Sequence, residues 1–212
     1  MTMHPLMRAA RRAITCSVLS ATLVLSVAAG SADAQTKNGT TRVRIDTDVG
    51  VILVDINADK APITAGNFLR YVAEKRYDGG AFYRVVTMQN QPTSPVKIEV
   101  IQGGLDGDST KRFPAIPHEP NDKTGLKHLD GTISMARSTP GSASSEFFIC
   151  INDQPELDFG GKRNPDGQGF AAFGRVVDGM NVVRRIQQSP ADSAPPQRLK
   201  TLPRIRSISI VK

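Results

Sequence analysis

Residues 81–104 read AFYRVVTMQNQPTSPVKIEVIQGG. Two short runs rich in β-branched and aromatic residues, 81–86 and 98–101, enclose a polar segment, 87–97, that carries Pro, Gln, Asn and Ser. Short apolar runs of this kind between turn-forming residues are typical of β-strands, and polar insertions between strands are typical of surface loops. The stretch therefore predicts two strands that are joined by a long loop.

The strand pattern continues on both sides of this stretch. Alternating apolar residues on either side of Val49-Gly50 predict a β-hairpin. Further strand-like runs lie at 131–136, 147–151, 170–176 and 205–211. Because many short strands occur with few helices, the sequence favours a mainly β sandwich or barrel.

Two helices and two irregular segments complete this interpretation. Pro62 suits the first turn of an amphipathic helix over 62–75, and a second helix is predicted over 180–188, after the Asp178-Gly179 turn. The segment 160–169 is polar and predicts a surface loop. The segment 189–203 holds four prolines and predicts an irregular connector.

The composition is that of an ordinary globular protein. The 212 residues are 39% hydrophobic and 22% charged, which argues against a disordered or fibrous chain. The net charge is +7, but the basic residues are scattered, so the sequence indicates no nucleic-acid role. The two cysteines, Cys16 and Cys150, are too few for a disulfide framework or a cysteine-based zinc site.

Residues 1–34 have the pattern of a secretory signal peptide. Arginines precede a charge-free stretch, 13–32, which ends in Ala32-Asp33-Ala34, so we expect cleavage after Ala34. Ser and Thr residues interrupt this stretch, which argues against a retained membrane anchor. A membrane anchor and twin-arginine export both stay minor alternatives. We therefore expect one domain, 35–212, that is periplasmic or secreted.

Other reactive side chains lack the pattern that their chemistry needs. His118-Glu119 and His128 lack a third convergent metal ligand, so structural roles are favoured. Ser144-Ser145 lacks the nucleophile elbow of serine hydrolases. Cys150 ends an apolar strand and is expected to be a small buried residue. The sequence therefore predicts no metal and no cofactor.

Six segments together carry a resemblance to a known family. In chain order they are APITAGNF at 61–68, AFYRVV at 81–86, IQGG at 101–104, GTISMAR at 131–137, EFFI at 146–149 and FGRV at 173–176. The chain resembles the cyclophilins, which are peptidyl-prolyl cis-trans isomerases. The resemblance implies a closed eight-stranded antiparallel barrel with a helix over each end and a proline-binding groove on its outer surface.

The resemblance also assigns candidate catalytic residues. Arg84 matches the catalytic arginine of the family, and Gln102 matches the glutamine that binds the substrate backbone and helps to position the arginine. A guanidinium suits this chemistry because it stays charged and offers several donors in a rigid fork. The alternatives are a surface arginine on a strand and a polar residue before the turn at Gly103-Gly104.

Further matches outline a proline pocket. Phe148 matches its aromatic floor, while Val100 and Leu157 match apolar positions in its lining or, alternatively, in the core. Phe147 should point the opposite way, into the core. Ala136 and Arg137 match the stretch along which the substrate backbone pairs like an added strand.

Four residues depart from the usual family pattern. Glu99 aligns with a pocket phenylalanine, although the preceding insertion leaves this register open. Glu146 replaces the usual glutamine, Glu156 stands where many members carry the tryptophan associated with cyclosporin binding, and Phe170 stands at the usual histidine. We expect weak cyclosporin sensitivity. A carboxylate such as Glu146 could orient Arg84 or hold it in a competing ion pair.

The sequence thus predicts a monomeric prolyl isomerase for proline-containing peptides and for unfolded or newly exported proteins. It is expected to have no membrane anchor and to bind no nucleic acid. Two alternatives stay open: a non-catalytic proline-peptide binding or chaperone module on the same fold, and a scaffold that uses the two long loops.

Overall fold

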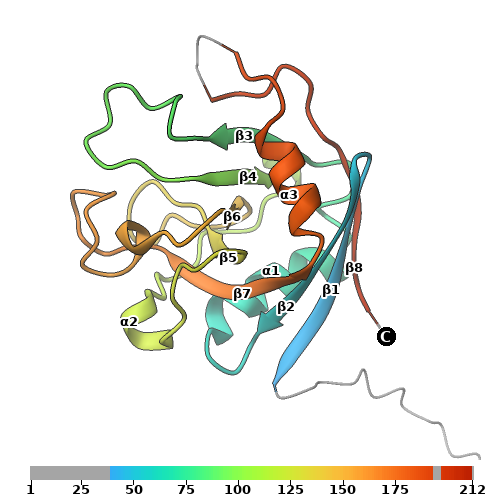
Figure 1. Ribbon diagram of the computed structural model, residues 1–212. Coiled ribbons are helices and arrows are strands. Elements are labelled where there is room, and N and C mark those ends of the chain that lie inside the picture. Colours follow the sequence, from blue (N-terminus) through green and yellow to red (C-terminus); the bar gives the residue numbers. More distant parts are fainter. Residues whose placement is uncertain (1–38, 193–196, 212) are drawn as a thin grey trace, which may run out of the picture. The chain divides into compact units, whose positions relative to one another are not determined.

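The computed structural model describes residues 39–192 and 197–211 (Figure 1). The predicted signal peptide, 1–34, lies outside these residues. Eight antiparallel strands form one sheet in the order β3-β4-β6-β5-β7-β2-β1-β8. The strands are β1 Thr40–Thr47, β2 Gly50–Asn57, β3 Ala81–Val86, β4 Val100–Gly104, β5 Thr132–Met135, β6 Phe147–Cys150, β7 Ala171–Asp178 and β8 Ile205–Ile210. The predicted mainly β architecture is confirmed.

The predicted hairpin consists of β1 and β2. Thr47 pairs with Gly50, and the Thr47 hydroxyl donates to the Gly50 carbonyl at 2.6 Å. Gly50 has a φ of 140°, which a residue with a side chain rarely adopts. Alternate residues such as Val43, Ile45 and Ile52 are fully buried, so the period of two directs one face of the hairpin into the core.

Two of the three α-helices in the described residues were predicted. α1 (Pro62–Ala73) begins with Pro62, and the Ile63 and Thr64 amides donate to the Glu119 carboxylate at 3.2 and 2.8 Å. α3 (Met180–Gln187) follows Gly179, whose φ is 91°. α2 (Asn121–Thr124) is a single turn, too short to show a helical period. The described part of the chain also contains two 3-10 helices, η1 (Ser109–Lys111) and η2 (Pro155–Leu157).

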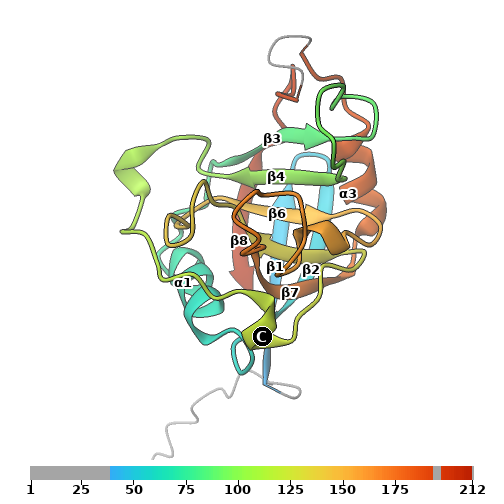
Figure 2. The ribbon, with the colours of Figure 1, turned by 90° about the vertical axis from the view of Figure 1, so that its left-hand side faces the viewer.

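The long helices pack against different parts of the sheet. α1 contacts β2, β7 and β8, whereas α3 contacts β2, β3 and β4. Figure 2 shows how the sheet curls between them. The two predicted helices, expected over the ends of a closed barrel, thus pack against different parts of the curled sheet.

The sheet is a curled half-barrel, so the expectation of a fully closed barrel needs correction. Among the described residues, β3 and the start of β8 are joined by one isolated bridge, Ala81 to Arg204, and by a few backbone hydrogen bonds around it. The connector occupies the rest of the β3 edge: the Val85 amide donates to Gln197, and the Leu199 amide donates to Tyr83. Because this edge is already paired, β8 cannot run alongside β3.

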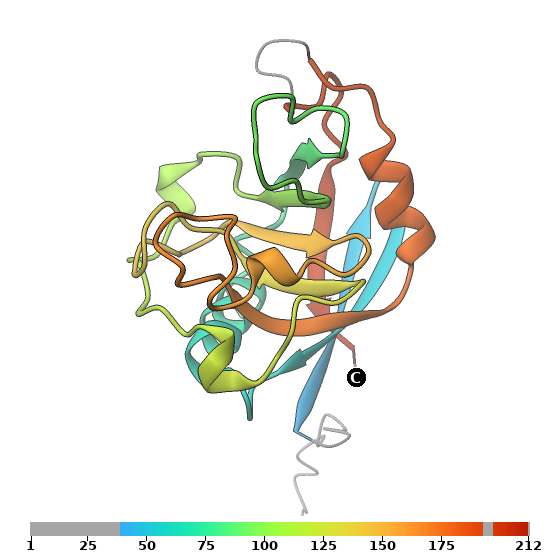
Figure 3. The ribbon, with the colours of Figure 1, turned by 60° about the vertical axis from the view of Figure 1, so that its left-hand side comes forward.

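The two faces of the sheet carry different apolar clusters. Phe147 belongs to the main core, with Phe68, Tyr77 and Phe82. Phe148 lies in a second cluster with Val86, Ile98, Val100, Cys150 and Leu157, against which Ala136 and Phe170 pack. Figure 3 shows the two long loops that follow β3 (green) and precede β7 (orange).

Candidate functional site

A β-bulge in β3 positions the arginine that the sequence singled out. Phe82 pairs with Gly103 and Arg84 pairs with Gln102, so Tyr83 is an extra residue between two ladder positions. Bulges of this kind redirect side chains next to active sites. Phe82 is fully buried in the core, whereas Tyr83 and Arg84 are both partly exposed. The bulge therefore moves Arg84 to the outer face, opposite Gln102.

Two glutamines fix the guanidinium of Arg84. Nη1 donates to Gln102 Oε1 at 2.7 Å, and Nε and Nη2 donate to Gln197 Oε1 at 2.9 and 2.6 Å. Gln102 is fixed in turn, because its Nε2 donates to the Tyr83 hydroxyl at 2.7 Å. A guanidinium has five N–H donors. Arg84 therefore keeps one further donor on each Nη atom for a ligand in the groove.

The electrostatic environment keeps this cluster in one protonation state. Burial raises the pKa of Tyr83 well above its usual range, and the charge of Glu146 raises it further, so the Tyr83 hydroxyl stays protonated. Burial lowers the pKa of Arg84, and the nearby charge of Arg163 lowers it further. An arginine retains its proton in proteins, so the groove holds a partly desolvated permanent cation.

A groove of about 440 Å³ opens beside Arg84. All nine residues that the sequence proposed for the site line it: Arg84, Val100, Gln102, Ala136, Arg137, Glu146, Phe148, Leu157 and Phe170. Phe148 and Phe170 meet edge to face, with ring centroids 5.3 Å apart, and form the floor and one wall of an apolar slot. Such a slot beside a cation and an amide suits a small apolar ring attached to a polar backbone.

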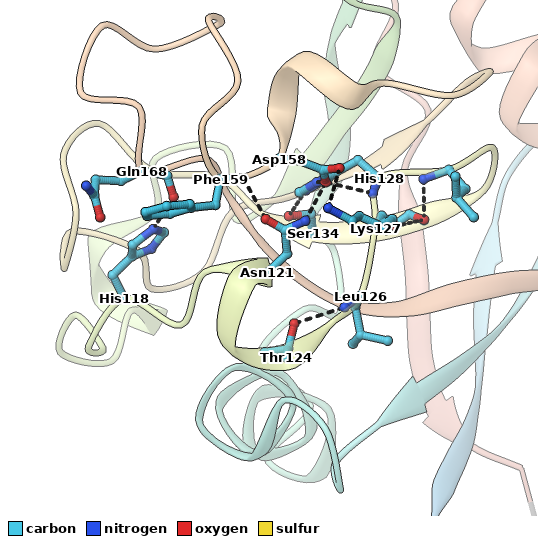
Figure 4. Close-up of polar contacts among 12 residues, drawn as sticks. His118, Asn121, Thr124, Leu126, Lys127, His128, Ser134, Asp158, Phe159 and Gln168 are labelled. Carbon is cyan, nitrogen blue, oxygen red and sulfur yellow. Dashed lines mark hydrogen bonds and ion pairs between the residues drawn. The ribbon is translucent and has the colours of Figure 1, made fainter.

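A buried polar cluster supports the floor of the slot. The His128 ring stacks on Phe148 at 6.0 Å, and its Nδ1 donates to Asp158 Oδ1 at 2.8 Å. His128 Nε2 lies 3.0 Å from the Ser134 hydroxyl (Figure 4). Ser134 is completely buried, so this serine, histidine and aspartate cannot attack a substrate. The arrangement fixes the aromatic floor from below.

Arg137 holds the loop before β7 in place. Its guanidinium donates to both oxygens of Asp166, at 2.7 and 2.9 Å, and its Nε donates to the Gly169 carbonyl at 2.9 Å. The cation also lies 5.0 Å from the Phe170 ring. The side chain is almost fully buried. Arg137 therefore anchors the loop that carries Phe170.

Two glutamates differ from expectation. Glu99 does not line the groove, whereas its neighbours Ile98 and Val100 do. Glu99 instead accepts a hydrogen bond from Asn152 at 2.9 Å. Glu146 lines the groove, but its Oε1 accepts from the Leu105 amide at 3.2 Å and from its neighbour Ser145. Neither of the two proposed contacts of Glu146 with Arg84 is present among the described residues.

Sequence reasoning did not propose Gln197, which holds Arg84 from beside the groove, or several lining residues, among them Arg163 and Ile98. Gln197 lies in the connector, where nothing marks it as functional. Arg163 lies in the loop 160–169, and its Nη1 donates to Gln91, Ser94 and Val96 of the loop 87–97. Ile98 could have been found, because it lies two positions before Val100 within the predicted strand 98–101.

The remaining candidates have structural roles. Within 39–192 and 197–211, no three His, Cys, Asp or Glu side chains come together as metal ligands. Glu119 binds the start of α1, and His118 Nε2 lies 3.0 Å from the Gln168 carbonyl. Cys150 is fully buried, which raises the pKa of its thiol well above the usual range. No helix in the described part of the chain is long and apolar enough to cross a bilayer.

Comparison with known families gives one clear match. Residues 42–210 match the model of the cyclophilin-type peptidyl-prolyl cis-trans isomerases. A peptidyl-prolyl cis-trans isomerase of Acinetobacter baylyi is 33% identical over 180 residues, which are 81% of this chain and 89% of the relative. Peptidyl-prolyl cis-trans isomerase A of Dickeya dadantii is 35% identical over 175 residues, 81% of this chain and 85% of the relative.

Solved structures agree on the fold. A cyclophilin-type isomerase of Cryptosporidium parvum superposes with a TM-score of 0.62 at 22% identity, covering 82% of this chain and 98% of the other. The same protein in the presence of the dipeptide Ala-Pro gives a TM-score of 0.60 over 81% of this chain and 99% of the other, also at 22% identity.

Proposed function

This chain belongs to the cyclophilin-type peptidyl-prolyl cis-trans isomerases, and from that premise we propose that the groove beside Arg84 is its catalytic site. The observation that supports the proposal most is the pair of glutamine contacts that hold Arg84 next to the Phe148–Phe170 slot. A proline ring would enter the slot, and the amide that precedes it would lie beside the guanidinium.

The reaction that this site performs is a bond rotation. Amide resonance sets a rotation barrier of roughly 18–20 kcal/mol, and uncatalysed X-Pro exchange takes on the order of 10–100 s. As the amide twists, resonance is lost and the proline nitrogen becomes pyramidal and more basic. A fixed donor beside that nitrogen binds the twisted amide better than either planar isomer, and this difference in binding lowers the barrier.

Each polar residue has a defined part in this proposal. Arg84 donates from its remaining Nη protons toward the twisted amide, while Gln102 and Gln197 prevent the guanidinium from turning away. Phe148, Val100, Leu157 and Phe170 hold the ring and exclude water from it. The Arg137 backbone has no partner among the described residues, and with Ala136 it would pair with the substrate backbone as an added strand.

The test is the isomerisation rate of short X-Pro peptides with the purified protein and with Arg84→Ala. A charge-assisted hydrogen bond contributes about 1.5–3 kcal/mol, so we expect kcat/KM to fall by roughly 10- to 150-fold. Circular dichroism and thermal unfolding check that the variant keeps its fold. Peptide binding by the wild type without any acceleration would instead indicate a binding module in which Arg84 is an anchor.

We also propose that the protein acts as a monomer on unfolded or newly exported proteins after a signal peptide is removed. The support is the pattern of residues 1–34 and a fold that needs no disulfide, since Cys150 is buried and free. Mass spectrometry of protein from the periplasmic fraction should give a chain that begins at Gln35, and sedimentation should give a monomer mass. A cytoplasmic chain that keeps Met1 would contradict export.

A further inference from the structure

The charge of the groove is not balanced. Among the described residues that line it, four are arginines (Arg84, Arg112, Arg137 and Arg163), and Glu146 alone is acidic. Arg137 is neutralised by Asp166. The Glu146 carboxylate is held by the Leu105 amide and the Ser145 hydroxyl. The groove therefore keeps an excess of positive charge beside the slot.

Arg163 is a partly buried arginine of the groove that forms no ion pair with a carboxylate among the described residues. Its Nη1 binds neutral oxygens only: Gln91 Oε1 at 3.0 Å, Ser94 Oγ at 2.7 Å and the Val96 carbonyl at 2.6 Å. In the described part of the chain, no carboxylate forms an ion pair with it, and its Nε and Nη2 have no acceptor. These contacts hold the side chain in place, while the N–H groups of Nε and Nη2 stay available to a ligand.

The charge of Arg163 influences Arg84, which lines the same groove. This charge is close enough to lower the pKa of Arg84, next in effect to burial itself. Arg84 also binds neutral partners only, the amide oxygens of Gln102 and Gln197. Two partly buried cations without a counter-ion repel each other, and the interaction is weakly screened because water is partly excluded. An anion placed between them would relieve this repulsion.

We propose that Arg163 forms a subsite for a carboxylate of the substrate, so that peptides with Asp or Glu next to the proline are preferred. This inference rests on the proposed function of the groove. The apolar slot identifies the ligand as a peptide, because it accommodates a proline ring beside the anion. The Nε and Nη2 pair suits a carboxylate, which accepts two parallel hydrogen bonds from such a fork.

The test compares kcat/KM for peptides that differ only in Glu or Gln next to the proline, placed either before or after it. For the wild type at low salt, we expect kcat/KM to be about three- to ten-fold higher with Glu in one of the two positions. This size lies between the effect expected of an exposed ion pair and that of a charge-assisted hydrogen bond. The preference should shrink at about 0.5 M salt, because screening weakens the pair.

Variants identify the residue responsible. In Arg163→Gln the ratio of the Glu to the Gln peptide should fall to about one, while Arg163→Lys should keep a preference of the same sign. Lys162→Gln is the matched control: it removes the same charge from an exposed neighbour that does not line the groove, and the ratio should stay as in the wild type.

Each outcome is decisive for this inference. An unaltered ratio in Arg163→Gln, or a wild type that turns over both peptides equally, would overturn it and leave the isomerase function intact. A wild type that accelerates neither peptide would contradict the proposed function instead. Because a ratio is measured, a lower overall rate of the Arg163 variants does not affect the result.

Discussion

Gln197 supplies two of the three hydrogen bonds that fix the Arg84 guanidinium, from a position 113 residues away along the chain. Its backbone also pairs with Val85, so the connector is held against β3. The position of the guanidinium matters because a donor that can turn away spends less time near the twisted amide. Gln197 thus positions Arg84 at the proposed catalytic groove.

Gln197→Ala should lower kcat by about ten-fold, the loss that corresponds to about 1.4 kcal/mol, with a smaller change in KM. The reason is that the slot still binds proline while Arg84 loses its fixed direction. Steady-state kinetics with one X-Pro peptide measures this split. The control is Gln89→Ala, at an exposed position in the neighbouring loop. An increase in KM with an unchanged kcat would show that Gln197 shapes the binding surface instead.

The difference between Gln102 and Gln197 shows what local sequence can reveal about a site. Gln102 stands in a segment with a recognisable pattern, next to two glycines, and could be proposed from the sequence. Gln197 follows two prolines in an irregular segment, and its contact with Arg84 depends on the path of the connector along β3. No local periodicity or propensity encodes such a path, so only the structure places the residue.

At the scale of elements, the loop 160–169 is part of the site because Arg137 anchors it. The bond with Arg137 lowers the pKa of Asp166 to about 2, and the Gln168 amide contributes as well. A carboxylate whose pKa is lower in the folded protein stabilises the loop at pH values above about 3.9, its ordinary pKa, and loses that effect as the pH falls through the folded value. The anchor is therefore complete at neutral pH.

Asp166→Asn should raise KM by about three- to five-fold at pH 7, with a smaller effect on kcat, because the wall formed by Phe170 loosens when a charge-assisted pair is lost. Peptide kinetics at pH 7 measures both constants. Asp122→Asn, at an exposed position in α2, serves as the control. If the KM of Asp166→Asn equals that of the control, the loop does not depend on this pair.

Most elements could be predicted because they follow a simple period. The strands of the hairpin and the helices α1 and α3 show alternation or helical spacing in the sequence. The bulge at Tyr83 could not be predicted, because it is defined by the register between two strands rather than by either strand alone. The closed barrel was wrong for a similar reason: the connector competes with β8 for the β3 edge.

At the scale of the whole molecule, Asp158 joins distant segments beneath the groove. Its Oδ1 accepts hydrogen bonds from Asn121 in α2, at 2.6 Å, and from the backbone and ring of His128, at 3.1 and 2.8 Å. The His128 ring stacks on Phe148, which forms the floor of the slot. Burial alone would raise the pKa of Asp158, but the hydrogen bonds from His128 and the nearby positive charge, that of Lys127 included, together outweigh burial, and the pKa lies below its usual value. Folding and the groove floor therefore depend on one ionised carboxylate.

The consequence is a defined acid sensitivity. The pKa of Asp158 is lower in the folded than in the unfolded chain, so its stabilisation is complete above about pH 4 and is lost as the pH falls further. Asp158→Asn should reduce the free energy of unfolding by about 2–3 kcal/mol at pH 7, because the buried hydrogen bonds that Asn121 and His128 donate to this side chain are weakened. Urea unfolding of both proteins from pH 7 to pH 2.5 measures the difference, which should narrow below pH 4 as the wild-type carboxylate is protonated. A difference that stays constant over this range would mean that Asp158 contributes through shape alone and that its charge does not couple folding to pH.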